Sequence, residues 1–597
     1  MTEQGGGVKP GNGGKGARSQ GTQSTAGKQP GEMASGVGEP GGQGEQVQPE
    51  MSAGARVRGL RAGWGRYLVA PRPLGLLGGG VPPVEASALF ALLEEDPEVE
   101  PVAQVRPSRS RGLGAIAELY PACPPVAVVV MPEERARALA ANPQVVVEID
   151  QPLSYTPAAA FGGLGMATPV MDPALAVPLE EPGRLSVLVK GSDGERLPGA
   201  HVWAVGTGAT SHAITGSDGQ ADLQLAADTP ATLRALYIRP ASGYWPLRID
   251  HPHLTHGVET VVEVQALADT FEGPGQAMSG WGAQAMRLHQ IPPTYRGHGV
   301  KIALLDSGAD TNHPDLKDTV RTGYDFTRLS GEKTWQSDST GHGTRCAGII
   351  AAADNRTGIT GIAAEAELHA LKLFPGGHIS DLLEAIDYCV THGIDIAQIN
   401  LAYPAPSQLA AWKLLDAHAA GIALIAPAGD TAGPVTQPAA LPDVLAVGAI
   451  AHTARPAGSS HAAPQPPWPG PYPAPFTATG PGVDLAAPGT AVITTAPGDG
   501  YIPADGTTIA AAHITGLAAL LLAHHDHLRT QTVPRTPART SQLHTLLRAA
   551  CRPIPGTDPA RTGAGLADAP TALGIHTAWQ YGPVAAQPHT ATGYPRA

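Results

Sequence analysis

The chain has 597 residues, with 39 Lys and Arg against 52 Asp and Glu, and therefore a net charge of −13 at pH 7. At about 150 residues per domain, this length allows three or four domains. The acidic balance, without a long cluster of Lys or Arg, argues against nucleic acid as a partner, because binding phosphates requires concentrated positive charge. The longest apolar runs, such as 517–523, are shorter than the roughly 18 to 20 residues that cross a bilayer, so no membrane role is expected.

The N-terminal segment differs in composition from the rest of the chain. Residues 1–55 contain 15 Gly in their first 50 positions and are predicted to form a disordered tail, since they cannot bury enough apolar surface to fold. The start lacks the charged segment and apolar core of a secretory signal, so the chain as written is expected to be cytoplasmic. It would be secreted if the start codon is misplaced or export is non-classical.

The four cysteines, Cys123, Cys346, Cys389 and Cys551, are scattered and show no CxxC spacing. This pattern predicts packed thiols rather than a zinc site or a disulfide framework.

The first folded region is predicted to be a small α+β domain over residues 56–155. Its segments read strand, helix, strand, strand, helix, strand over 66–70, 85–95, 101–105, 126–131, 133–141 and 144–150. This order predicts a split βαβ, ferredoxin-like module. A linker rich in Pro, Ala and Gly is expected over 156–183.

The next region, 184–268, is predicted to be all-β. Short strands are expected over 184–190, 201–205, 221–225, 232–238 and 259–264, separated by Asp-Gly and Pro-Gly turn signals. Such spacing predicts a small sandwich, and its layout is similar to carboxypeptidase regulatory-like domains. Two roles stay open for it: a spacer that braces the following domain, or a module that binds carbohydrate or a partner.

The largest region, 281–575, alternates strand-like and helical segments and is followed by a short tail over 576–597. The expected segments are 300–305, 342–353, 366–374, 379–392, 394–401, 409–419, 422–427, 444–447 and 508–524. This alternation predicts an α/β fold with a doubly wound parallel sheet, in which active sites lie at the carboxyl ends of strands.

Three motifs in this region carry chemistry. Asp306 ends an apolar strand, His342 stands between two glycines at a helix start, and Thr508 lies in a Gly-Thr-Thr turn that enters an Ala/Leu-rich helix. Each motif alone is typical of a turn or a helix cap. Together, in this order, they resemble the signature blocks of the subtilases, subtilisin-like serine peptidases in which an Asp orients a His that takes the proton from a Ser.

The resemblance covers residues 281–573, about half of the chain, and further matching blocks stand at 355–364, 426–430, 480–489 and 563–568. It implies that residues 66–155 are similar to the subtilase propeptide, a folding aid and inhibitor whose tail enters the cleft. Calcium stabilises many subtilases, but no loop here is specific enough to assign as its site, and Asp310 and Asp315 are expected to be turn residues. No other cofactor is expected.

The chain departs from the family at three places. Thr508 stands at the position of the nucleophilic Ser, and its methyl group restricts the hydroxyl. Asp430 stands where most subtilases have an Asn that donates to the oxyanion, and a protonated Asp would be needed to replace it. In the strand that binds substrate, Asn400, Leu401, Ala402 and Tyr403 align with Ser-Leu-Gly-Gly, so Ala402 or Tyr403 is expected to narrow the cleft.

Two functions follow from these departures. In the first, the protein is a subtilisin-like homologue that binds peptides while hydrolysis is lost or weakened. In the alternative, it is an active endopeptidase in which His342 is the general base for Thr508, Asp306 fixes the His tautomer, and a protonated Asp430 completes the oxyanion hole. Both predict an extended peptide or protein segment as the partner, besides the propeptide-like domain itself, and the second predicts self-cleavage near the 156–183 linker.

Overall fold

The structure of the protein is a computed structural model. It describes residues 61–73, 82–106, 123–155, 183–206, 211–225, 228–254, 257–270, 280–327, 334–452 and 470–575. The tails expected over 1–55 and 576–597 and nearly all of the linker expected over 156–183 lie outside the described residues.

The first elements form a four-stranded sheet with two helices. They are β1 (Trp64–Pro71), α1 (Ala86–Glu95), β2 (Glu100–Val105), β3 (Val126–Pro132), α2 (Glu133–Ala140) and β4 (Val145–Ile149). The sheet has the order β2-β3-β1-β4 and its pairings are antiparallel. Tyr67 and Val69 of β1 pack with Leu89 and Phe90 of α1, so the helices cover one face of this sheet.

Two further sheets follow in the chain. Their strands are β5 (Gly183–Gly191), β6 (His201–Val205), β7 (Ser211–Ile214), β8 (Gln220–Leu225), β9 (Ala235–Arg239), β10 (Leu247–Asp250) and β11 (Thr260–Val264). One sheet has the order β10-β9-β6-β7 and the other β11-β5-β8, and both contribute to one apolar core. Strands β7 and β10 are absent from the sequence prediction because four residues give too short a periodic signal.

The largest sheet has eight strands. Its elements are β12 (Lys301–Asp306), β13 (Thr322–Asp325), β14 (Glu367–Lys372), β15 (Ile396–Ile399), β16 (Ala423–Pro427), β17 (Val444–His452), β18 (Pro471–Pro473) and β19 (Leu485–Pro488). The order is β13-β14-β12-β15-β16-β17-β18, with β19 beside β17. Each pair of neighbouring strands from β13 to β17 in this order is parallel. The predicted doubly wound α/β sheet is therefore confirmed.

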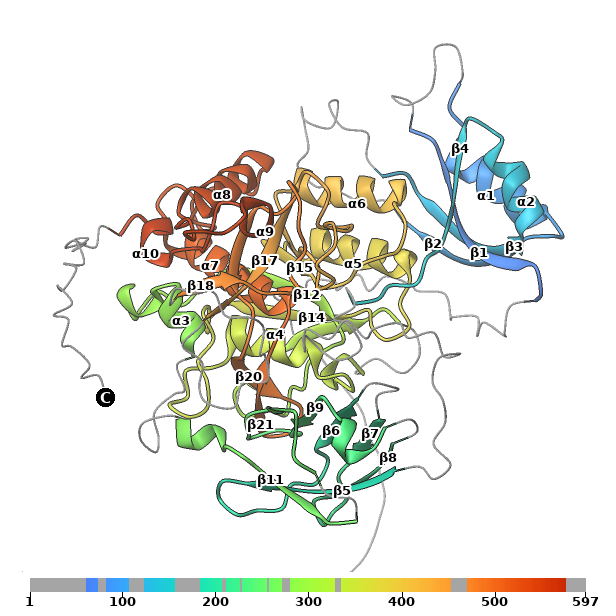
Figure 1. Cartoon of the computed structure of the whole chain (residues 1–597). Helices are drawn as coiled ribbons and strands as arrows, with labels where there is room; N and C mark the ends of the chain where they lie inside the picture. The colour runs from blue at the N-terminus through green and yellow to red at the C-terminus, as the bar shows by residue number, and fades with distance from the viewer. Residues whose placement is uncertain are drawn as a thin grey trace, which may run out of the picture. The chain divides into compact units, whose positions relative to one another are not determined.

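Helices cover both faces of this sheet (Figure 1). The helices of this region are α3 (Trp281–Ala285), α4 (His342–Ala351), α5 (Ile379–Thr391), α6 (Gln408–Ala419), α7 (Thr507–His524), α8 (Pro537–Ala549), α9 (Pro559–Thr562) and α10 (Ala569–Ala572), and a hairpin of β20 (Val492–Ala496) and β21 (Gly500–Ala504) precedes α7. Ile302 and Leu304 of β12 pack in the core of α4 and α7, whereas Ala303 and Leu305 pack in the core of α5 and α6. This alternation arises because successive side chains of a strand point to opposite faces.

Helix α7 crosses the middle of the domain and is buried from Thr507 to Leu522. Within the part of the chain that the structure describes, it is the one helix long and apolar enough to suit a membrane span. Its sequence contains the apolar run at 517–523. Burial on all sides explains its composition, because such a helix needs no polar face.

The smaller units contact the large domain through defined surfaces. The face of the first sheet opposite its helices, including Leu68 and Val128, packs in the same core as Leu382 of α5 and Leu409 of α6. In the second unit, Trp245 is buried with Ile493 of the hairpin. These contacts bring segments that are distant in sequence next to the large sheet.

Candidate active site

Asp306 lies at the carboxyl end of β12, where parallel strands open toward a common edge. Its side chain is fully buried. Burial opposes its ionisation, but His342 beside it, together with hydrogen bonds from His342, Asn400 and the Ser307 N–H, lowers the pKa of the Asp306 carboxyl. Asp306 is therefore a carboxylate near neutral pH.

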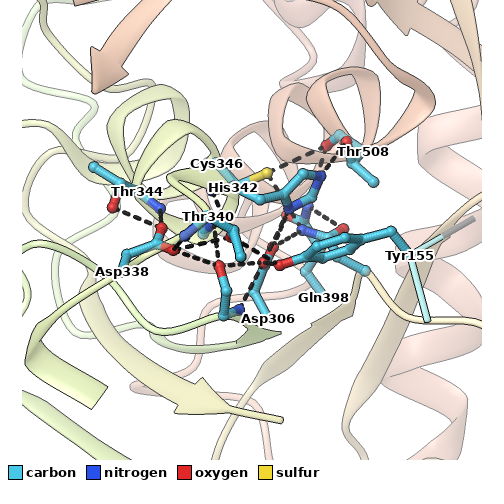
Figure 2. A network of polar contacts seen from close by, with 12 residues as sticks. Tyr155, Asp306, Asp338, Thr340, His342, Thr344, Cys346, Gln398 and Thr508 are labelled. Carbon is cyan, nitrogen blue, oxygen red and sulfur yellow. Dashed lines mark hydrogen bonds and ion pairs between the residues drawn. The ribbon is translucent and has the colours of Figure 1, made fainter. Parts of the chain in front are cut away.

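His342 connects this carboxylate to Thr508. Its Nδ1 lies 2.9 Å from both oxygens of Asp306, and its Nε2 lies 3.1 Å from Thr508 Oγ1 (Figure 2). Since a carboxylate only accepts, Nδ1 carries the proton and donates it to Asp306. Nε2 is then free to accept the proton of the Thr508 hydroxyl, as a general base must.

Two polar residues of the β15 region support this arrangement. Asn400, expected to bind substrate, instead donates from Nδ2 to Asp306 Oδ2 at 2.7 Å. Gln398 donates from Nε2 to Asn400 Oδ1 at 2.9 Å and to the Thr508 carbonyl at 3.3 Å. Sequence reasoning missed Gln398; its one signal is a polar residue within an otherwise apolar strand.

Asp338, also missed, organises the loop before His342. Its Oδ1 accepts from the N–H groups of Thr340 and Gly341 and from the Thr340 hydroxyl, while Oδ2 accepts from Thr344 (Figure 2). The carboxylate therefore fixes the chain on both sides of His342. Its signal in the sequence is an acidic residue four positions before the histidine.

Asp430 is buried beneath the turn that begins α7. Its Oδ1 accepts from the Thr507 N–H at 2.7 Å. Burial raises the pKa of the Asp430 carboxyl, although the hydrogen bonds from Thr507 act in the opposite direction. This environment favours the protonated form, which has an O–H to donate.

The predicted substrate-binding strand pairs with another segment of the chain, although it lacks the two glycines of the subtilase motif. Ala402 exchanges two backbone hydrogen bonds with Ser154, at 2.8 and 3.0 Å. Leu401 and Tyr403 are buried in the apolar core beneath. The expected narrowing of the cleft by Ala402 or Tyr403 thus does not prevent a strand from pairing here, because the Tyr403 side chain packs into that core.

Residues 151–155 run between two edges of the domain and form an isolated β-bridge with each of them. On the edge opposite Ala402, the Leu153 N–H donates to the Gly377 carbonyl at 2.8 Å, and the Ile379 N–H donates to the Gln151 carbonyl at 3.0 Å. The antiparallel bridges pair Pro152 with His378 and Ser154 with Ala402. A backbone held on both sides in this way defines a groove for an extended peptide.

Asp315 is not the simple turn residue that the sequence suggested. It is fully buried, and its carboxylate accepts from Asn355 Nδ2 at 2.8 Å, the Ile359 N–H at 3.0 Å and the Tyr501 hydroxyl at 2.9 Å. Hydrogen-bond donors surround this carboxylate, whereas calcium requires six to eight oxygen ligands. These residues therefore do not fit a calcium site.

A doubly wound sheet that places an Asp beside a His and the His beside a hydroxyl is the combination found in subtilisin-like serine peptidases. Residues 297–565 match the model of the subtilase family. The chain is 34% identical to subtilisin Savinase of Lederbergia lenta over 248 residues, which are 40% of this chain and 83% of that protein. The protein belongs to the subtilase family.

Other relatives are matched over a smaller share of their length. M-protease of Shouchella clausii (strain KSM-K16) is 34% identical over 40% of this chain and 59% of its own length. Subtilisin E of Bacillus subtilis (strain 168) is 32% identical over 39% of this chain and 57% of its own length. The chain thus spans less than two thirds of these two relatives.

Proposed function

We propose that the protein binds extended peptides in the groove beside His342 and that its peptide hydrolysis is lost or strongly weakened. The observation that carries this proposal is the segment of residues 151–155, which pairs with Ala402 on one edge and Gly377 on the other. Backbone pairing of this kind is the means by which sheet edges bind peptides.

The domain that precedes this segment acts as a ligand of the large domain, as a subtilase propeptide does. Asp150 Oδ1 accepts from the Ser380 N–H at 2.9 Å, and Glu148 Oε1 accepts from the Gln408 N–H at 2.8 Å. Ser380 and Gln408 lie in the first turns of α5 and α6, where unpaired N–H groups and the helix dipole favour a carboxylate. Two anchors next to the groove therefore fix residues 151–155 in position.

Two residues weaken the chemical step. The methyl group of Thr508 limits the rotation of its hydroxyl, and misplacing an attacking atom by about 1 Å costs on the order of 100-fold in rate. Asp430 offers a donor only while protonated, and the loss of one oxyanion donor costs roughly 100- to 1,000-fold. Both effects act on the same transition state.

A second candidate, a peptidase that uses Thr508, is favoured by one observation. The 3.1 Å contact between His342 Nε2 and Thr508 Oγ1 has the length that proton transfer to a general base requires. In this case His342 takes the Thr508 proton, Asp306 stabilises the resulting imidazolium, and the protonated Asp430 with the Thr508 N–H binds the oxyanion.

The unit of β5 to β11 is proposed to brace the large domain. Trp245 is 1% exposed and packs with Ala352, Ile493 and Leu267, and the Gly243 N–H donates to the Tyr501 carbonyl at 2.7 Å. A fixed contact with the hairpin before α7 is what a brace requires.

Two measurements test the proposed function. The intact mass of the full chain, 61.0 kDa, is measured after incubation together with labelling by a fluorophosphonate probe. A persistent full-length chain without label supports the first function, whereas self-cleavage that disappears in Thr508→Ala establishes the peptidase instead.

Binding is measured on an opened variant, Ser154→Pro with Tyr155→Ala, which removes the N–H that donates to Ala402. A fluorescent peptide with the sequence of residues 150–156 is expected to bind this variant and not Ser154→Ala, which keeps the N–H. Failure of the peptide to bind the opened variant would refute the proposed groove.

A further inference from the structure

The side chain of Tyr155 fills a slot beside His342. Its ring is stacked on His342 with the centroids 4.2 Å apart and an interplanar angle of 29°, and it packs against Phe374, also at 4.2 Å. Figure 2 shows the tyrosine reaching past His342 toward Asp306. Two aromatic rings therefore form walls that fit a third flat ring.

The end of the slot is polar. The Tyr155 hydroxyl lies 3.1 Å from Asp306 Oδ1 and 3.3 Å from Thr340 Oγ1. The Tyr155 hydroxyl donates its hydrogen to Asp306 Oδ1, and the Thr340 hydroxyl donates to Asp338 Oδ1 at 3.0 Å. The Asp306 carboxylate can only accept, so the slot favours a side chain that donates from this position.

The tyrosine can act as that donor. Burial and the nearby Asp306 raise the pKa of the Tyr155 hydroxyl above its ordinary range, which keeps it protonated. Along this segment, Gln151 and Leu153 are buried and Pro152 and Ser154 are exposed, so Tyr155 continues the set of side chains that face the domain. The side chain at this position of a bound peptide therefore points toward the domain and contacts the groove.

We propose that this slot, formed by His342, Phe374, Thr340 and Asp306, selects a tyrosine side chain in the extended peptides that the groove binds. The proposal rests on the proposed function, since it concerns the ligands of the same groove. A phenylalanine fills the space between the rings but brings no donor to Asp306. An alanine leaves the space between the two rings empty.

The test uses the opened variant, Ser154→Pro with Tyr155→Ala, and three fluorescent peptides with the sequence of residues 150–156. They differ only at the sixth residue, which is Tyr, Phe or Ala. A hydrogen bond to a charged acceptor predicts that the Phe peptide binds about ten- to hundredfold more weakly than the Tyr peptide, and the Ala peptide more weakly still. The tethered segment competes equally with all three peptides, so it cancels in their ratios.

Each outcome decides a different point. Equal binding of the Tyr and Phe peptides overturns the selectivity and leaves the groove standing, whereas binding of none overturns both proposals. In a second variant, Phe374→Leu, the affinities of the Tyr and Phe peptides are expected to fall by a similar factor, because this change removes a wall and keeps the acceptor.

A measurement on the otherwise unaltered chain does not depend on folding of the opened variant. Tyr155→Phe is expected to accelerate hydrogen exchange at the Ser154 and Ala402 amides about tenfold or more, since the segment is held less firmly. The matched control is Tyr403→Phe, because the Tyr403 hydroxyl is buried without a hydrogen-bond partner among the described residues. Unchanged exchange in Tyr155→Phe would also overturn the selectivity.

Discussion

His342 Nε2 lies 3.1 Å from Thr508 Oγ1, while His342 Nδ1 lies 2.9 Å from Asp306. The threonine therefore keeps its hydroxyl where the relay needs it, and its chemical difference from a serine is one methyl group. Any defect in catalysis then arises from the freedom of that hydroxyl and from the oxyanion side of the site.

Replacing Thr508 by serine removes this methyl group. Thr508→Ser is expected to increase the rate of fluorophosphonate labelling by about tenfold or more, because the hydroxyl gains rotational freedom beside His342. Labelling is followed on the full chain with Thr508→Ala as the control. A serine variant as inert as the alanine variant would place the main defect at Asp430.

Asp430→Asn tests the charge on the oxyanion side. The raised pKa of the Asp430 carboxyl means that the folded chain holds this proton more tightly than the unfolded chain. Its contribution to stability is present at low pH and is lost as pH rises through the raised pKa. Asp430→Asn is therefore expected to increase the free energy of unfolding at pH 8 by about 1–2 kcal/mol, which raises the melting temperature. At pH 4 the substitution is expected to change the melting temperature little.

Thermal unfolding of the wild type and Asp430→Asn at both pH values measures this effect. The exposed residue Asp318 provides the matched control, Asp318→Asn. A variant that melts at the same temperature as the wild type at pH 8 would show that Asp430 is ionised there at no cost.

We expect Asp416 to make the stability of the folded chain depend on pH. Its Oδ2 accepts from the Cys123 N–H at 3.0 Å, and burial raises the pKa of its carboxyl to about 6. The unfolded value is near 4, so the stabilisation is complete below about pH 4 and declines as pH rises to about 6. Asp416→Asn is expected to flatten this decline.

The measurement is chemical denaturation of the wild type and Asp416→Asn at pH values between 4 and 7. The free energy of unfolding of the wild type should fall over this interval relative to that of Asp416→Asn. Parallel curves for the two proteins would contradict the prediction.

Trp245→Ala tests the contact between the β5–β11 unit and the hairpin. Removing this buried side chain leaves a cavity beside Ile493 and is expected to cost about 3–5 kcal/mol. Chemical denaturation measures the loss, and Trp245→Phe, which keeps most of the apolar contact, should cost clearly less. An alanine variant as stable as the wild type would show that this surface does not brace the large domain.

Much of the large domain was predictable from local patterns. Strand β12 ends at Asp306 and helix α4 begins at His342, as the sequence suggested, because periodicity and turn residues act within a few residues of each other. The directions in which the side chains of Asn400 and Tyr403 point were not predictable. Both depend on side chains that approach from other parts of the chain.

The sequence by itself determined which chemical groups stand at the decisive positions: a hydroxyl with an extra methyl at Thr508 and a carboxyl at Asp430. Only the tertiary structure decided how these groups behave. The burial that favours the protonated form of Asp430, and the contact of Tyr155 with Asp306 across 151 positions of the chain, arise from packing between distant segments. Such packing sets dielectric surroundings and hydrogen-bond partners, which no local pattern of residues encodes.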